Sequence, residues 1–158
     1  MRENHVVSLG KLVANLHSLE CLLRAYLLAI AQKSGSTRIG PDYWNLNAGD
    51  SVAEDEFTNY DTLGTLIVKF NADVSTRDAS LALDSKVVDI RDLIAHGRVA
   101  SANADLSELK IVKFGPPRNG VAIVSDCAVM NDAWFRKCIN LVVEQVQRAH
   151  SAFEQYAV

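Results

Sequence analysis

Apolar residues recur at steps of three and four along much of the chain, which is the period of an amphipathic helix. The longest such pattern runs from His5 to Lys33 and stops before a Ser-Gly-Ser segment. Residues 34–60 are then rich in Gly, Asn, Ser and acids and show little periodicity. We therefore predict a long helix followed by a long loop, with a helical turn near Glu54 to Phe57.

Two further helices are expected before residue 97. Asp61 is a suitable N-cap for a helix over Thr62–Phe70. Ser75 is a suitable N-cap for a helix that begins at Thr76, and its apolar stripe continues to His96. This third helix should end there, because Gly97 is the residue type favoured just past a helix C-terminus.

The pattern changes over residues 108–126, where two runs of β-branched and aromatic residues flank a Gly- and Pro-rich segment at 115–120. This pattern predicts a β-hairpin. A last helix should follow, with Asn131 or Asp132 as its N-cap, and should run to about Tyr156.

The expected fold class is mainly all-α. Because the strand signal is confined to one adjacent pair, the simplest packing is an antiparallel four-helix bundle with the hairpin inserted between the third and fourth helices. The 158 residues match one ordinary domain spanning 1–158, and 49% hydrophobic with 22% charged residues is a globular composition.

The formal net charge of −3 restricts the classes of partner. Any contact with nucleic acid must come from a local basic patch, which argues against a DNA-binding protein that is indifferent to sequence. Three cysteines, Cys21, Cys127 and Cys138, stand among apolar neighbours, so we expect buried reduced thiols. The histidines and cysteines lack a metal-ligand spacing, so neither a metal nor another cofactor is expected.

The N-terminus has no basic start followed by an apolar signal core, and Arg24 interrupts the longest apolar run, Leu22–Ala31. These features favour a cytoplasmic protein without membrane attachment.

The candidate chemistry lies in Arg91 and His96. Arginine matches phosphate oxygens with a permanent planar charge, and histidine exchanges protons near neutral pH. The same residues also suit a helix end, where cations face the negative end of the dipole. On a continuous helix the two side chains diverge by about 140°, and Asp92, one turn before His96, could form a weak surface pair with it.

The stretch Val87-Val88-Asp89-Ile90-Arg91-Asp92-Leu93-Ile94-Ala95-His96-Gly97, with Leu63-Gly64 and Leu66-Ile67 upstream, resembles the signature of HEPN domains, the higher eukaryote and prokaryote nucleotide-binding superfamily. The motif is an arginine, a polar residue, three mostly apolar residues and a histidine. Arg91, Asp92 and His96 match it position by position, and the predicted helix order extends the resemblance to most of the chain.

The resemblance implies metal-independent RNA cleavage at a homodimer cleft, by a toxin of a toxin–antitoxin system, with a cognate antitoxin as a further partner, or by an abortive-infection effector against phage. Arg91 and His96 would be the catalytic residues and Asp92 a supporting one. The alternative is a non-catalytic HEPN-like module that dimerises and binds a partner or a nucleotide. Some members place an acid on the first helix as a brace for the arginine, and Glu20 could take this role; its other expected partner is Arg24, one turn on.

Arg98 departs from the HEPN toxins that are silenced by adenylylation, which carry tyrosine at this position. It could instead add positive charge to an RNA groove, or act as a helix-end cation. Tyr43 and Trp44 in the long loop are expected to pack over the bundle, the alternative being stacking on bases.

Overall fold

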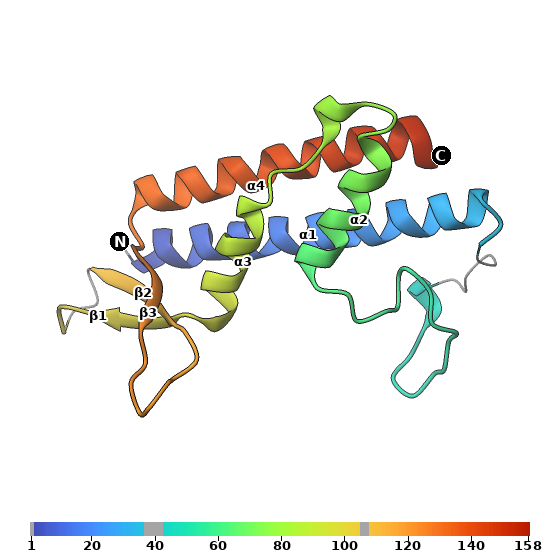
Figure 1. The fold of residues 1–158 in the computed structure, drawn as a ribbon. Coiled ribbons are helices and arrows are strands. Elements are labelled where there is room, and N and C mark those ends of the chain that lie inside the picture. The colour runs from blue at the N-terminus through green and yellow to red at the C-terminus, as the bar shows by residue number, and fades with distance from the viewer. Residues whose placement is uncertain (1, 37–42, 105–107) are drawn as a thin grey trace. The chain divides into compact units, whose positions relative to one another are not determined.

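The computed structural model describes residues 2–36, 43–104 and 108–158. Over these residues it is mainly helical, with a small antiparallel sheet (Figure 1). The helices are α1 (Arg2–Lys33), α2 (Leu63–Val74), α3 (Lys86–His96) and α4 (Asp132–Ala152), with short helical turns η1 (Tyr43–Asn45), η2 (Ala79–Leu81) and η3 (Phe153–Ala157), and the strands are β1 (Arg98–Ser101), β2 (Leu109–Phe114) and β3 (Val124–Val129).

The chain divides into two compact units. Residues 1–17 and 84–144 form the first, which we call the sheet unit, and residues 18–83 and 145–158 form the second, the loop unit. The sheet unit contains α3, the three strands and the first parts of α1 and α4, whereas the loop unit contains the segment after α1, α2 and the remaining parts of both long helices.

The strands of the sheet unit are ordered β1-β2-β3, and both pairings are antiparallel. The predicted pairing of two strands is thus confirmed, but its second strand begins at Val124 rather than Val121. The chain reverses at Asn119 and Gly120, whose φ values are 52° and 76°, and Arg118 and Val121 exchange two backbone hydrogen bonds around them. Two residues with positive φ make a hairpin turn of the type that Asn-Gly favours. The strand β1 was not predicted.

The third helix begins ten residues later than predicted. Ser75 is not an N-cap but the C-cap of α2, and its N–H donates to the Asn71 carbonyl at 3.1 Å. The Asn71 side chain then holds the backbone of Leu83, donating to its carbonyl at 2.9 Å and accepting from its N–H at 2.8 Å. These side-chain bonds occupy backbone groups of Leu83 that a continuing helix would pair, and between α2 and α3 the chain forms only the short turn η2.

The N-cap of α2 is Thr62, whose hydroxyl accepts from Thr65 N–H at 3.3 Å. The prediction of Asp61 was wrong by one residue, because the Asp61 carboxylate instead lies 2.7 Å from the Lys69 ammonium. The helix also extends one turn beyond the predicted Phe70, to Val74. The prediction for the fourth helix was accurate: Asn131 Oδ1 accepts from the Trp134 N–H at 2.9 Å, and the helical path continues through η3.

In the long loop, the predicted turn is present, because Asn59 N–H donates to the Asp55 carbonyl at 3.0 Å. Tyr43 stacks on Phe57 with ring centroids 4.4 Å apart. Trp44, expected to pack, is instead 92% exposed. Part of the predicted loop, residues 37–42, lies outside the described residues.

Two of the three cysteine predictions were wrong. Cys138 is buried, whereas Cys21 and Cys127 are exposed, since they lie on the outward side of a helix and on an edge strand. By length and composition alone, α1 also passes as a membrane-spanning helix over Asn4–Lys33. Within the described residues its buried positions, which include Leu12, Leu16, Leu19 and Leu23, follow one helical stripe, and core helices of soluble proteins pass the same test.

Candidate functional site

The helix α3 carries both motif residues and ends directly after His96. Gly97 follows with an extended backbone, φ −71° and ψ 153°, and its N–H donates to the Leu93 carbonyl at 2.8 Å. A Cβ atom at Gly97 would overlap that carbonyl and lie 2.5 Å from Ile111 Cγ1. Glycine is therefore required here by lack of space and not by a left-handed backbone, and the chain passes from α3 straight into β1 (Figure 1).

Arg91 is half-exposed and ion-paired with its own neighbour. Its Nη1 lies 3.1 Å from Asp92 Oδ1, with side chains that are 39% and 35% exposed. An ion pair this accessible to water contributes less than about 1 kcal/mol to folding. The guanidinium can therefore exchange this carboxylate for a phosphate at little cost in stability.

Asp92 has a second cation beside it, Lys113 of β2, whose Nζ lies 3.5 Å from Asp92 Oδ2. Residues two apart on a strand share a face, so Lys113 points to the same side as Ile111, which is 2% exposed and packs at the end of α3. Asp92 is thus engaged by Arg91 and Lys113, in place of the expected surface pair with His96. Lys113 was not predicted as a site residue, although it lies two positions after the apolar Ile111 in a run expected to form a strand.

His96 is exposed at the last position of α3. Because the helix is unbroken from Arg91 to His96, ideal helix geometry directs the two side chains about 140° apart. Within one chain the motif residues therefore share a helix end and leave the helix axis in different directions.

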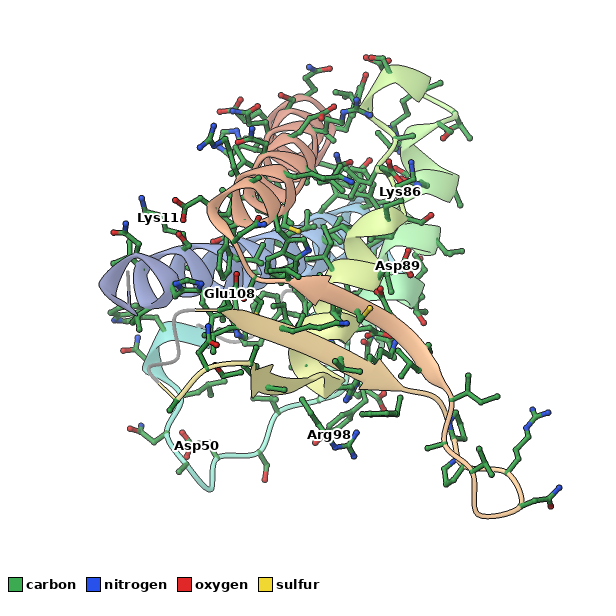
Figure 2. All side chains as sticks on the ribbon, turned by 90° about the vertical axis from the view of Figure 1, so that its left-hand side faces the viewer. Lys11, Asp50, Lys86, Asp89, Arg98 and Glu108 are labelled. Carbon is green, nitrogen blue, oxygen red and sulfur yellow. The ribbon has the colours of Figure 1, made fainter. Side chains whose placement is uncertain are left out.

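Arg98 is the first residue of β1 and not a helix-end cation. Its guanidinium carbon lies 5.2 Å from the centroid of the Phe114 ring. Figure 2 shows it beside β1, at the opposite edge of the sheet from β3. A cation placed over an exposed aromatic ring is a suitable surface for phosphate and base together.

Glu20 belongs to the loop unit, where it pairs with Arg24. Its Oε1 accepts from Arg24 Nη2 at 3.0 Å and from Arg24 Nε at 3.2 Å. Arg24 is one of the two partners expected for Glu20. A role as a brace for Arg91 stays a prediction.

Charges of both signs lie around the motif in the sheet unit, since Asp89 is on α3 and Asp126 stands opposite Lys113 in the β2–β3 ladder. Arg91, Lys113 and Arg98 are carried by α3, β2 and β1, against the carboxylate of Asp92. Among the residues that the structure describes, no group of three or more His, Cys, Asp or Glu side chains is arranged to hold a metal ion. Comparison of the chain with protein-family models, with curated proteins and with solved structures finds no match.

Proposed function

We propose that this protein is a HEPN-type ribonuclease: a single mainly helical domain with an antiparallel four-helix arrangement, acting as a homodimer that cleaves RNA without a metal ion. The supporting observation is the position of the motif. His96 is exposed at the end of α3, and Arg91 is half-exposed with only a weakly held carboxylate partner. The biological class would be a toxin controlled by an antitoxin, or an effector of phage defence.

The proposed reaction is an internal transfer of the RNA phosphate. The His96 imidazole takes the proton of a ribose 2′-hydroxyl, the 2′-oxygen bonds to phosphorus, and the bond from phosphorus to the 5′-oxygen breaks. The leaving 5′-oxygen receives a proton from His96 of the second chain. The products are a 2′,3′-cyclic phosphate and a 5′-hydroxyl, and Arg91 stabilises the negative charge that grows on the phosphoryl oxygens.

The neighbouring charges then have supporting roles. Asp92 positions Arg91 until substrate arrives, and Lys113 holds Asp92 from β2. Arg98 with the Phe114 ring adds positive charge toward the flanking nucleotides. Because the two motif side chains diverge within one chain, a two-fold axis is what brings a histidine from each copy to one cleft.

The test is cleavage of RNA in EDTA by the purified wild type, by Arg91→Ala and by His96→Ala. Two matched controls are Arg118→Ala at the exposed hairpin turn and His150→Ala, an exposed histidine 3.5 Å from Glu154. We expect both motif variants to lose about a hundredfold or more in rate, since proton transfer by His96 and charge stabilisation by Arg91 each contribute that much, and both controls to keep full activity. Intact RNA with the wild type, or equal losses in motif and control variants, would reject the nuclease.

The dimer is tested by measuring mass in solution and specific activity over a dilution series. We expect a dimeric mass and a specific activity that falls as the dimer dissociates. A specific activity that stays constant through dissociation would show that one chain suffices, against the proposed cleft. Expression of the wild type should also slow growth, and expression of His96→Ala should not.

The second candidate is a non-catalytic HEPN-like module that binds a partner or nucleotide. The ion pair between Arg91 and Asp92 favours it, because a guanidinium held by a carboxylate can serve structure alone. This module would form dimers and leave RNA intact in the same assays. Its Arg91→Ala variant would then weaken dimerisation or partner binding instead of a reaction rate.

A further inference from the structure

A pocket of about 330 Å³ lies within the sheet unit, between α3, β3 and the first turns of α4. This volume falls in the range of small-molecule sites. The α3 residues that line it, among them Lys86, Ile90 and Leu93, follow the three- and four-residue step of one helix face. Arg91 and His96 are not among them, so the pocket is separate from the motif. Figure 2 shows Lys86 and Asp89 on the β3 side of the sheet, away from Arg98.

The pocket meets β3 along its edge. Three consecutive residues, 126–128, line it. Because neighbouring side chains of a strand point to opposite faces of the sheet, three in a row can line one pocket only where it lies along the edge of the strand. Met130 N–H donates to the Leu109 carbonyl at 2.8 Å, and the ladder continues through Ile111 with Ala128. Hydrogen-bonded pairs alternate along an antiparallel ladder, so Cys127 turns its N–H and C=O away from β2, toward this edge. The edge thus offers one backbone donor and one backbone acceptor.

The inner part of the pocket is apolar. Leu93 and Cys138 are each 4% exposed, and burial raises the pKa of the Cys138 thiol, which keeps it neutral. Trp134 is half-buried and presents its ring from the first turn of α4. Such a surface suits a branched or aromatic hydrocarbon group.

The charged residues of the lining balance one another. Lys86 and Lys137 supply two cations, and Asp89 and Asp126 supply two carboxylates, from all three surrounding elements. The Lys86 side chain is 76% exposed, and its Nζ lies 3.9 Å from Asp84 Oδ2. An ion pair this long and this accessible to water does not hold the lysine in one position. A ligand with a single charge would be attracted by two of these four side chains and repelled by the other two. A ligand with one positive and one negative group can place each group beside side chains of opposite charge.

We propose that this pocket binds a small zwitterion with an apolar side chain, the chemistry of a free hydrophobic amino acid. Its ammonium group would lie toward Asp89 and Asp126, its carboxylate toward Lys86 and Lys137, and its side chain against Trp134 and the apolar inner wall. This site is independent of the proposed ribonuclease, because it needs neither Arg91 nor His96.

Emission from Trp134 reports occupancy directly. The other tryptophan, Trp44, is 92% exposed, so Trp44→Phe leaves one reporter in the pocket. Three probes with the same hydrocarbon group separate the charges: L-leucine, 4-methylpentanoate without the ammonium, and 3-methylbutylamine without the carboxylate. We expect saturable binding of leucine, and at least about tenfold weaker binding of the other two, since each loses hydrogen bonds between charged groups.

Substitutions in the Trp44→Phe background complete the test. Lys137→Met and Asp89→Asn should each weaken leucine binding at least about tenfold, while Lys110→Met, an exposed lysine on β2 outside the pocket, should leave it unchanged. Circular dichroism and thermal unfolding establish that each variant is folded. Absence of saturation, equal binding of the three probes, or equal binding by Lys137→Met would overturn the proposal. Binding of a blocked, extended dipeptide in place of leucine would also overturn it, in favour of strand addition at β3.

Discussion

Two arginines of this chain, Arg24 in the loop unit and Arg91 in the sheet unit, occupy opposite environments. The Arg24 side chain is 13% exposed and donates to Glu20, to both oxygens of Asn59 and to the Asp61 carbonyl, at 2.8–3.2 Å. The Arg91 side chain is 39% exposed and pairs with the adjacent Asp92. One guanidinium ties α1 to the segment before α2, and the other remains accessible to a ligand.

Other charged side chains of the loop unit are also held by several partners, as Arg24 is. Lys69 lies 2.9 Å from Glu56 and 2.7 Å from Asp61, and hydrogen bonds to both carboxylates raise the pKa of its ammonium. Tyr26 donates to Asp73 at 2.5 Å, and Arg77 donates to the same carboxylate. Charge in the loop unit serves to hold an irregular segment against helices, because that segment has few regular backbone bonds of its own. At the end of α3, by contrast, the half-exposed Asp92 carboxylate contacts Arg91 of the same helix and Lys113 of β2.

The largest effect on stability is therefore expected from Arg24→Met. Met keeps an apolar stem but leaves the Asn59 and Asp61 carbonyls and the Glu20 carboxylate without their donor, a loss of about 2–4 kcal/mol in the free energy of unfolding. Urea denaturation measures it, with Arg118→Met at the exposed hairpin turn as the matched control. A loss under about 1 kcal/mol would show that water replaces Arg24 and that the two arginines are equivalent.

Gly97→Ala should come next, at about 1–3 kcal/mol, the usual cost of forcing extra volume into a packed site. The added methyl group would collide with the Leu93 carbonyl and with Ile111, so the junction between α3 and β1 has to move. The loss of stability would arise in the sheet unit, directly beside the motif. Gly10→Ala, on α1 where a Cβ meets open space, should instead be neutral or stabilising. Equal effects at both glycines would contradict the steric explanation.

Gly97 also illustrates what the sequence could and could not predict. The helix end at His96 followed from residue type, since glycine is rare inside helices, but the actual reason, the closeness of Ile111, depends on a strand far along the chain. The start of α3 failed for a similar reason. Ser75 suited an N-cap locally, whereas the bonds between Asn71 and Leu83 that occupy the Leu83 backbone are tertiary. The helical period of apolar residues predicted α1, and the same period with an N-cap predicted α4, because these signals are local in sequence.

The candidate site divides in the same way. Arg91, Asp92 and His96 are close in sequence, so their placement at one helix end was predictable. Lys113 and the β3 edge come from strands whose register is set by pairing, and β1 is four residues long, too short to give a period-two signal.

A smaller effect, dependent on pH, is expected from Asp73→Asn. Burial alone would raise the pKa of the Asp73 carboxyl, but the hydrogen bonds from Arg77 and Tyr26 outweigh it and hold the pKa below its ordinary value of 3.8. Burial and the bond to Asp73 raise the pKa of Tyr26, so its hydroxyl stays a donor. A carboxyl group whose pKa is lowered in the folded state stabilises the fold at pH values above its ordinary pKa. This stabilisation is lost as the pH falls from the ordinary pKa through the lowered one.

The free energy of unfolding of the wild type should therefore exceed that of Asp73→Asn by about 1 kcal/mol at pH 7. This difference should shrink as the pH falls through 3.8 toward the lowered pKa. Urea titrations at a series of pH values measure it. Asp50→Asn, at an exposed carboxylate, provides the control for general effects of charge. A difference that is constant over this range would place the carboxylate outside the Tyr26 and Arg77 contacts.

The smallest change in stability is expected from Arg91→Ala, the counterpart of Arg24→Met in the sheet unit. Its ion pair with Asp92 is exposed and contributes less than about 1 kcal/mol, and Lys113 remains beside the carboxylate at 3.5 Å to compensate it. Thermal unfolding should hardly shift, while RNA cleavage, if the proposed reaction is right, should fall by two orders of magnitude or more. A loss of stability comparable to that of Arg24→Met would mean that Arg91 is a structural arginine too, and its charge would then no longer be available to a phosphate.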